Sequence, residues 1–273
     1  MELPLSPQVF SIVAHLIEER TGIHYDAGDL DALAEKLSDR ARERGLASLL
    51  DYYYFLRYDE GGSAELSALV ENLVVRETYF FREIEPLRVV VDSIIPGLLR
   101  ERPEVRLWSA ACATGEEPYT IAMMLSDAGL LDRVTIVASD ISELSLAKAR
   151  AAAYGGRSLR VLGEHPHGQH FIDEGRGIKR VHDRLRKAIG WRRVNLVDDT
   201  AVRDLGSFDL IVCRNVLIYF ADATVERVAR RLTRALRPGG LLLVGSAESL
   251  LRFGSPLVCE ERGGSFFYRK PTE

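Results

Sequence analysis

The sequence predicts an α/β fold, preceded by a small all-helical domain and interrupted by a small β-rich insertion. Apolar residues recur at helical spacing over residues 1–75, and apolar strands alternate with helical segments from about residue 101. That alternation is lost over about 157–190. Strands alternating with helices favour a mostly parallel sheet covered on both faces. We therefore expect a helical domain at 1–75, a linker and connecting helix at 76–100, and an α/β domain at 101–273.

Composition narrows the class of protein. The 273 residues are 47% hydrophobic, which is enough for two modest cores, and a net charge of -4 argues against nucleic-acid binding by charge alone. The cysteines Cys112, Cys213 and Cys259 are widely spaced and match no zinc or disulfide pattern, which suits a reducing compartment. No apolar run is long enough to cross a bilayer, and Glu2 stands where a signal peptide would be basic. We expect a cytoplasmic protein without membrane insertion.

Four helices are expected in the N-terminal domain, at about 7–21, 29–45, 49–58 and 63–74. Ser6 and Pro7 are a typical helix start, with a capping hydroxyl before a proline at the first helical position. The second helix carries Lys36, Arg40 and Arg44 at four-residue spacing. This basic stripe has two interpretations: a solvated helix face, or a landing surface for an acidic partner.

The segment after this domain, Arg76-Glu77-Thr78-Tyr79-Phe80-Phe81-Arg82-Glu83, is unusual for a linker because three aromatic residues stand between polar ones. The aromatic residues could simply pack one domain on the other. Arg82 follows them directly, and a guanidinium that leaves an apolar stretch needs a partner because burying it alone is unfavourable. Residues 84–99 then form a helix leading to the first strand.

The first strand ends in a loop of small residues. Residues 106–119 read Arg-Leu-Trp-Ser-Ala-Ala-Cys-Ala-Thr-Gly-Glu-Glu-Pro-Tyr, a pattern of strand, tight loop and helix that brings backbone N–H groups close to a ligand. An ordinary strand-to-helix turn would look similar. Only Gly115 is present where a dinucleotide fingerprint needs three glycines, and no Gly-Lys-Ser/Thr phosphate loop follows.

Polar residues also follow three later strands. Asp140 ends the apolar run 134–139, Asn195 follows a short strand that begins at 191, and Asn215 follows the buried-type strand 208–213. The carboxyl ends of parallel strands form one edge of the sheet, where open α/β sheets bind ligands. A carboxylate at the second strand can accept hydrogen bonds from ribose hydroxyls. A nucleoside without phosphate is implied, and S-adenosylmethionine (SAM) fits that description.

The insertion carries three histidines and an excess of positive charge. His165, His167 and His170 invite a metal interpretation, but no Cys, Asp or Glu beside them completes a tetrahedral set, so we expect no metal site. Residues 176–193 contain eight Lys or Arg against one Asp, an excess of 8 − 1 = 7 positive charges. This predicts an electropositive face, with solvated charge as the alternative.

The same motifs resemble a known family. Residues 76–83, 108–119, Ala138-Ser139-Asp140-Ile141 and Cys213-Arg214-Asn215-Val216-Leu217-Ile218-Tyr219-Phe220 together are similar to the CheR-type chemotaxis receptor methyltransferases, in the family's order and over almost the whole chain. The resemblance implies a Rossmann-like SAM-dependent methyltransferase sheet. It implies methyl transfer from SAM to glutamate side chains of methyl-accepting chemotaxis receptors, with S-adenosylhomocysteine as product.

The resemblance also implies roles for particular residues. A cofactor site would be lined by Thr78, Arg82, Glu117, Asp140, Asn195, Leu196, Asn215 and Val216. Arg82 and Tyr219 would lie nearest the chemistry. Arg76 stands where better-known members have asparagine, so no cofactor role is assigned to it. Some members dock a receptor C-terminal peptide on the β-subdomain, but the hairpin around Gly175-Arg176-Gly177 looks short, which argues against such tethering.

Two other functions are compatible with the residues alone. One is a methyltransferase for a small molecule, against which the basic surfaces argue because a small acceptor needs none. The other is a signalling scaffold that binds SAM without turnover, against which the presence of both Arg82 and Tyr219 argues. The leading hypothesis is a protein-glutamate O-methyltransferase that acts on the cytoplasmic domain of chemotaxis receptors.

Overall fold

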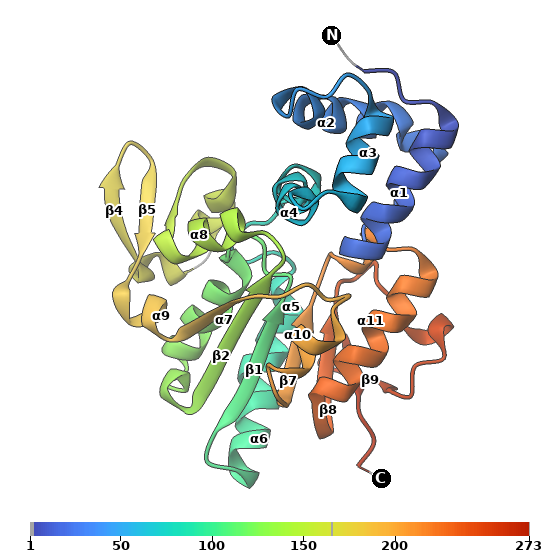
Figure 1. The fold of residues 1–273 in the computed structure, drawn as a ribbon. Helices are drawn as coiled ribbons and strands as arrows, with labels where there is room; N and C mark the ends of the chain where they lie inside the picture. Colours follow the sequence, from blue (N-terminus) through green and yellow to red (C-terminus); the bar gives the residue numbers. More distant parts are fainter. Residues whose placement is uncertain (1–2, 165, 273) are drawn as a thin grey trace. The chain divides into compact units, whose positions relative to one another are not determined.

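The computed structural model describes residues 3–164 and 166–272 (Figure 1). The chain forms two compact units, one of Met1–Val75 with Tyr219–Val225, the other of Arg76–Ile218 with Glu226–Glu273. Within the described residues, no helix is both long enough and apolar enough to cross a membrane.

The first unit is a helical bundle of α1 (Pro7–Thr21), the short 3-10 turn η1 (Ala27–Asp29), α2 (Leu30–Glu43), α3 (Leu49–Tyr58) and α4 (Gly62–Leu73). The Ser6 hydroxyl caps α1 by accepting a hydrogen bond from the Val9 amide. Helix α4 starts at Gly62, one residue before the expected Ser63, and no side chain caps it. A Cβ at Gly62 would lie 2.4 Å from the carbonyl oxygen of Phe55, so only glycine permits the close approach of α3 and α4.

Two residues of the basic stripe, Arg40 and Arg44, pair with a carboxylate that the sequence did not link to them. Arg40 donates two hydrogen bonds, of 2.8 and 2.7 Å, to the fully buried carboxylate of Glu65 on α4. The Nε of Arg44 donates a third, of 2.5 Å, and the hydroxyl of Tyr52 a fourth, of 2.8 Å. Both arginines therefore pair with a buried carboxylate of the bundle, although the Arg44 side chain is 43% exposed, and the landing surface for an acidic partner stays a prediction.

A segment distant in sequence completes this unit. Phe220 forms an antiparallel bridge with Ile23, and the His24 amide donates a 2.8 Å hydrogen bond to the carbonyl of Tyr219. The hydroxyl of Thr224 contacts Glu18 at 3.3 Å. Residues 219–225 thus belong to the helical unit although they follow a strand of the other unit.

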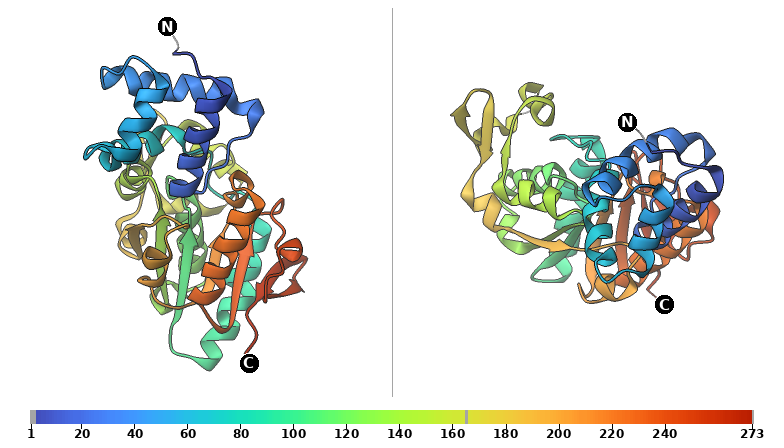
Figure 2. Two further views of the ribbon diagram at one scale, coloured as in Figure 1. Left: turned by 45° about the vertical axis from the view of Figure 1, so that its right-hand side comes forward. Right: turned by 45° about the horizontal axis from the view of Figure 1, so that its top comes forward.

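The second unit is built on a seven-stranded sheet of order β6-β2-β1-β7-β8-β10-β9 (Figures 1 and 2). Its strands are β1 (Val105–Ala110), β2 (Val134–Asp140), β6 (Ile189–Arg193), β7 (Phe208–Cys213), β8 (Leu236–Val244), β9 (Val258–Arg262) and β10 (Ser265–Arg269). The pairs β6–β2, β2–β1, β1–β7 and β7–β8 are parallel, whereas β10 runs antiparallel to β8 and β9. The strand order reverses at β1, the topological point where such sheets bind ligands. The expected α/β fold is confirmed.

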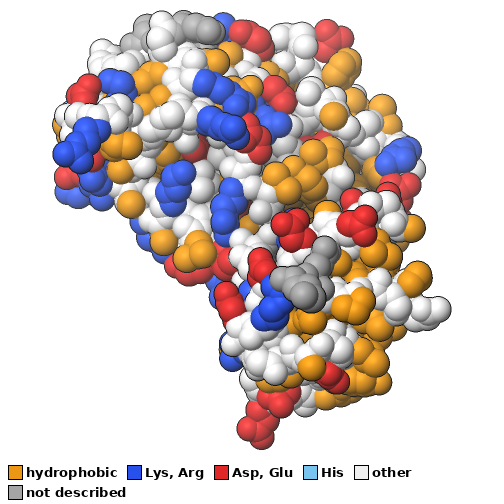
Figure 3. Space-filling view, turned by 90° about the horizontal axis from the view of Figure 1, so that it is seen from above, with side chains coloured by type: hydrophobic (Ala, Val, Ile, Leu, Met, Phe, Trp, Pro, Cys, Tyr) orange, Lys and Arg blue, Asp and Glu red, His pale blue; other side chains and the backbone are white. Residues whose placement is uncertain are grey.

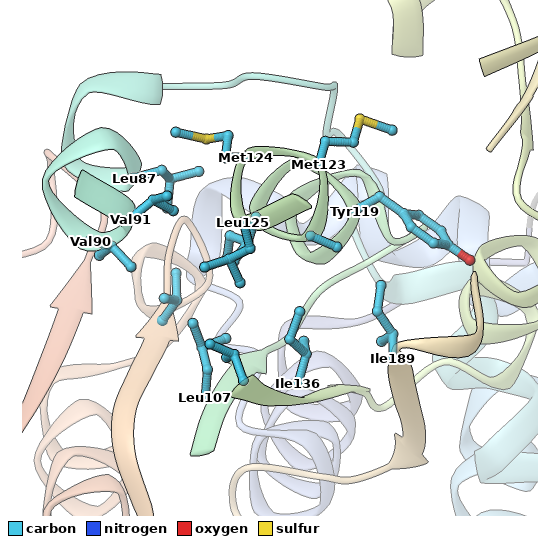
Figure 4. Packing of buried hydrophobic residues seen from close by; sticks show 14 of the residues in the cluster. Leu87, Val90, Val91, Leu107, Tyr119, Met123, Met124, Leu125, Ile136 and Ile189 are labelled. Atoms are coloured by element: carbon cyan, nitrogen blue, oxygen red, sulfur yellow. The ribbon is translucent and has the colours of Figure 1, made fainter. Parts of the chain in front are cut away.

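The helices of this unit are α5 (Ile84–Val89), α6 (Ile95–Glu101), α7 (Glu116–Asp127), α8 (Glu143–Ala151), α10 (Asp199–Arg203) and α11 (Asp222–Ala235), the last of which begins in the helical unit and enters this one at Glu226. A π-helical turn, η2 (Val90–Ile94), separates α5 from α6, where one continuous helix was expected. Pro96 is the second residue of α6, and a proline inside a helix has no N–H and clashes with the preceding turn. The widened π-helical turn before it relieves this clash. The expected connecting helix contributes to the core: Leu87, Val90 and Val91 pack with Leu107 and Ile136 of the sheet (Figure 4).

The insertion contains a second, three-stranded sheet of order β3-β5-β4, from β3 (Ala153–Tyr154), β4 (Phe171–Gly175) and β5 (Ile178–Val181). The hairpin between β4 and β5 turns on Gly175, Arg176 and Gly177, which have φ angles of 82°, 54° and 75°. Three 3-10 turns, η4 (Gly156–Leu159), η5 (Leu162–Glu164) and η6 (Pro166–His170), precede β4, and α9 (Asp183–Lys187) follows β5.

The positive excess over residues 176–193 is partly compensated. Lys179, Arg180, Arg184 and Arg186 each lie within 4.0 Å of an acidic side chain. Figure 3 shows Lys, Arg, Asp and Glu side chains on the face seen from above. Four of the eight basic residues therefore have acidic neighbours, so the face is less electropositive than the composition predicts.

Candidate functional site

The polar residues singled out after the strands lie at one edge of the large sheet. Asp140 is the last residue of β2, Asn195 follows β6 and Asn215 follows β7. The loop 111–115 follows β1, which pairs in parallel with both β2 and β7. These four positions therefore share the carboxyl edge, where β1 marks the reversal of strand order.

The loop after β1 is tightly constrained. Ala111, Ala113 and Gly115 have φ angles of 54°, 46° and 92°. Left-handed backbone is unfavourable for alanine by roughly 1–2 kcal/mol per residue, so the surroundings must hold this shape. The Cys112 amide donates a 2.9 Å hydrogen bond to the carbonyl of Ser139 at the end of β2.

Gly115 has a packing role in this loop. A Cβ there would lie 2.7 Å from the Cβ of Ala149 and 3.0 Å from the Trp191 ring. The neighbouring Thr114 carbonyl accepts a 2.7 Å hydrogen bond from the buried Tyr154 hydroxyl. Gly115 thus lets the start of α7 approach α8 and β6 closely.

Asp140 fixes the loop from the adjacent strand. Its side chain is 7% exposed, and its two oxygens accept hydrogen bonds from the amides of Ala113, at 2.8 Å, and Ser142, at 2.9 Å. Asp140 therefore fixes the orientation of the loop after β1.

Glu117, on the first turn of α7, belongs to a buried charge cluster. The Ser109 hydroxyl donates a 2.7 Å hydrogen bond to one carboxylate oxygen, and Nη1 of Arg214 lies 3.6 Å from the other. Burial raises the pKa of the Glu117 carboxyl, against the lowering effects of Arg214 and Ser109.

Arg214 is the centre of that cluster, and the sequence reasoning gave it no role. Its side chain is 2% exposed, its Nη2 donates a 2.8 Å hydrogen bond to the Arg82 carbonyl, and it lies 3.5 Å from a Glu83 oxygen. The buried Nε of Arg214 has no hydrogen-bond partner in the described part of the chain. An available signal was its place directly after the buried strand β7, because a buried guanidinium requires acceptors.

Arg82 has the partner that the sequence required. Its Nη1 donates a 3.0 Å hydrogen bond to the Glu77 carbonyl, and its Nε lies 3.7 Å from Glu83. Its neighbours Phe81 and Glu83 have φ angles of 63° and 45°, so it lies in a constrained turn. Thr78, on the same segment, is half-buried.

Glu248, which follows β8, is a second residue that sequence reasoning missed. Its carboxylate accepts 2.7 Å hydrogen bonds from the amides of Asn215, Leu217 and Gly245. Asn215 has a φ of 58°, and its side-chain amide donates a 3.2 Å hydrogen bond to Glu83. Glu248 therefore holds the backbone on both sides of the half-buried Val216. A lone glutamate in a loop carries little signal in a sequence.

The remaining expected residues lie as follows. Asn195 accepts a 3.1 Å hydrogen bond from the Val197 amide through its side chain, and Leu196 is buried. Arg76 contacts the Ser145 hydroxyl at 3.2 Å. Tyr219 lies in the segment that belongs to the helical unit, so the structure assigns it and Arg82 to different units.

The edge fits SAM in its chemistry. Ribose hydroxyls need acceptors, and Asp140 would offer them a carboxylate. The sulfonium and ammonium groups of SAM are cationic, and Glu117 would offer them an acidic partner on the first turn of α7. The loop after β1 is built of small residues, which lets a flat ring approach its backbone.

Comparison with known proteins agrees with this assignment. Residues 76–260 match the family model "CheR methyltransferase, SAM binding domain", and residues 8–74 match "CheR methyltransferase, all-alpha domain". The chain is 33% identical over 258 residues to "Chemotaxis protein methyltransferase 2" of Vibrio cholerae, covering 93% of this chain and 89% of that protein. It is 34% identical over 256 residues to "Chemotaxis protein methyltransferase" of Vibrio parahaemolyticus, covering 91% of each.

A third relative carries a different name. The chain is 36% identical over 241 residues to "Probable biofilm formation methyltransferase WspC" of Pseudomonas putida, which covers 86% of this chain and 55% of that protein. The family models and the relatives span both the helical and the sheet-based parts. The chain therefore belongs to the CheR methyltransferase family and is a SAM-dependent methyltransferase.

Proposed function

We propose that this enzyme transfers the methyl group of SAM to glutamate side chains in the cytoplasmic domain of methyl-accepting chemotaxis receptors. Glutamate methyl esters and S-adenosylhomocysteine are the products, formed in the cytoplasm. The family match over both parts of the chain supports this proposal, as do relatives named chemotaxis protein methyltransferases.

The cofactor site in this proposal is the carboxyl edge of the sheet. Its lining is Thr78, Arg82, Glu117, Asp140, Asn195, Leu196, Asn215 and Val216. The observation that supports it best is Asp140, a nearly buried carboxylate at the end of the strand beside β1 whose orientation two backbone amides fix. Such a carboxylate is typical of a site that recognises ribose hydroxyls.

Methyl transfer to a carboxylate requires no strong general base from the protein. A glutamate carboxylate is already ionised at neutral pH, and SAM supplies an activated methyl group on a sulfonium. A bond forms between the carboxylate oxygen and the methyl carbon while the sulfur–carbon bond breaks, and its electron pair stays on the sulfur. The protein must exclude water and align the acceptor, which are effects of proximity and desolvation. In this proposal Arg82 orients the acceptor and Tyr219 donates a hydrogen bond at the transfer centre.

The test uses the full chain with methyl-labelled SAM and receptor-containing membranes. We expect label in the receptor band that is released as methanol by mild alkali, because carboxyl methyl esters hydrolyse in base. The matched control is a receptor whose methyl-accepting glutamates are replaced by alanine, which should take up no label. Alkali-stable label, or label in both receptors, would show a different acceptor.

A second measurement separates catalysis from cofactor binding. Tyr219→Phe is expected to lower turnover while leaving the affinity for S-adenosylhomocysteine nearly unchanged, because the hydrogen bond is made chiefly in the transition state. A methylation rate close to that of the wild type would remove Tyr219 from the mechanism, whereas the cofactor assignment would stand.

A further inference from the structure

We propose that Asp127, His167 and His170 form a binding site for one zinc ion, which braces the insertion against helix α7. The sequence alone gave no expectation of a metal, because only the histidines lie close together in the chain. The third ligand comes from 40 residues earlier, the last residue of α7. His165, the remaining histidine of this stretch, lies outside the described residues.

The three side chains converge on one point. Nδ1 of His167 lies 2.5 Å and Nε2 of His170 lies 2.7 Å from opposite oxygens of the Asp127 carboxylate. The three ligand atoms all fall within 4.8 Å of one another. A tetrahedral zinc site with bonds of about 2.0–2.2 Å spaces its ligand atoms by roughly 3.3–3.5 Å, so small side-chain movements suffice to admit the ion.

The local backbone explains why the two histidines act together. His167 and His170 are three residues apart on the 3-10 turn η6, and residues at that spacing in a 3-10 helix lie on the same side. Their side chains are 14% and 12% exposed, with the rings nearly parallel at 6.2 Å. The two histidines are therefore half-buried and ordered by packing, whereas Asp127 is exposed at the end of α7.

The ligand set favours zinc over a hard cation. Two imidazoles and one carboxylate, with a water in the fourth position, are an established donor set for zinc, whereas Mg²⁺ and Ca²⁺ prefer oxygen ligands. The Gln169 side chain donates a 3.0 Å hydrogen bond to the same carboxylate. Such outer contacts orient a ligating carboxylate.

The site also contacts the Arg82 segment. The ring of Phe81, next to Arg82, stacks on His167 at 5.0 Å with an interplanar angle of 19°. The Phe81 amide donates a 3.1 Å hydrogen bond to the Thr120 hydroxyl on α7. An ion on His167 would therefore join the insertion, α7 and the turn that carries Arg82, and its role is structural.

The test is a calorimetric titration of the full, untagged chain with zinc chloride. We expect one zinc per chain, an increase of Tm on zinc addition, and affinity at least about tenfold weaker in His167→Gln and in Asp127→Asn, as for loss of a metal ligand or its support. His15→Gln is the matched control, because His15 is exposed on α1 and should leave affinity unchanged. Substoichiometric binding, or equal binding in all four proteins, would overturn the proposal.

A measurement on the wild type alone covers the case in which the variants do not fold. X-ray absorption at the zinc edge of the one-to-one complex should show two imidazole nitrogens at about 2.0–2.1 Å together with oxygen ligands. A spectrum of oxygen ligands without imidazole would overturn the site. Neither readout depends on methyl transfer, so failure of the zinc proposal would leave the proposed function untouched.

Discussion

Glu65 in the helical unit and Arg214 in the sheet-based unit are both buried charged side chains, but their surroundings differ. Glu65 is fully buried and accepts four hydrogen bonds of 2.5 to 2.8 Å from two arginines and a tyrosine. Arg214 donates one short hydrogen bond, its two carboxylate neighbours lie 3.5 and 3.6 Å away, and its buried Nε has no partner among the described residues.

This difference indicates that the two clusters have different roles. A buried charge whose hydrogen-bonding positions are all filled stabilises the fold, because its hydrogen bonds offset the free-energy cost of removing the charge from water. An under-satisfied buried polar atom in a native structure calls for an explanation, and a functional site is a common one. We therefore interpret the Glu65 cluster as structural and the Arg214 cluster as part of the cofactor site.

The largest expected effect follows from removing the partner of Glu65. Arg40→Glu leaves a buried carboxylate facing a second one, and breaking a buried ion pair costs about 3–5 kcal/mol. Urea denaturation should therefore show a lower free energy of unfolding. The matched control is Arg42→Glu on the same helix, whose 3.2 Å pair with exposed Asp39 is worth at most about 1 kcal/mol. Equal stabilities of the two variants would refute the structural interpretation.

The next effect concerns ligand affinity at the sheet edge. Asp140→Ala removes the acceptor for ribose hydroxyls and should weaken S-adenosylhomocysteine binding by about 1.5–3 kcal/mol, the range for hydrogen bonds to charged groups. Asp140→Asn keeps one oxygen and should lie between the wild type and the alanine variant. Calorimetric titration measures both. Unchanged affinity in a folded Asp140→Ala protein would remove the residue from the cofactor site.

A smaller effect distinguishes the two clusters directly. Arg214→Lys keeps the charge but loses the planar fork that reaches the Arg82 carbonyl and two carboxylates. We expect about a tenfold loss of S-adenosylhomocysteine affinity, which is about 1.4 kcal/mol. The control is Arg237→Lys, which pairs with Asp209 near the start of β7 and lies away from the carboxyl edge. Similar losses in both variants would mean that Arg214 supports only the fold.

The sequence predicts the sheet-based site better than the helical cluster, for a physical reason. The periodicity of the sequence predicts the strands, and the carboxyl ends of parallel strands meet at one edge of a sheet. These two facts place Asp140, Asn195 and Asn215 at that edge without any knowledge of tertiary contacts. The spacing of Arg40 and Arg44 is equally compatible with a solvated face. Their partner Glu65 lies 25 and 21 residues away, and only tertiary packing shows that it is buried.

The same limit applies to the residues that sequence reasoning missed. Arg214 directly follows a buried strand, which was an available signal, whereas Glu248 stands in a loop where position alone does not reveal burial. Asp127 lies at the end of α7, and nothing in the chain's local pattern links it to histidines 40 residues later. Periodic hydrophobic patterns in the sequence reveal helices and strands and where they end. Contacts between distant helices and strands depend on how these pack, which the patterns do not show.

The smallest expected effect compares the two carboxyl groups. Burial raises the pKa of Glu117, despite Arg214 and Ser109, whereas hydrogen bonds from Arg40, Tyr52 and Arg44 hold the pKa of Glu65 below its usual value although burial opposes them. A raised pKa in the folded state gives stability that is present below the unfolded pKa, about 4.3, and lost as pH rises through the folded value. Ionised Glu117 is therefore unfavourable for the free protein at neutral pH.

Replacing Glu117 by the uncharged glutamine tests whether its ionised carboxylate lowers the stability of the folded protein. Glu117→Gln should equal or exceed wild-type stability at pH 7, within about 1 kcal/mol, and its advantage should shrink as pH falls through the folded pKa of Glu117. Urea denaturation of the cofactor-free proteins between pH 4 and 8 measures it, with exposed Glu85→Gln as the control. For Glu65 the sign is opposite: its stabilisation is present at neutral pH and lost on acidification, so Glu65→Gln should destabilise at pH 7. If Glu117→Gln destabilises as strongly as Glu65→Gln, both carboxylates are structural, and the contrast between the two clusters fails.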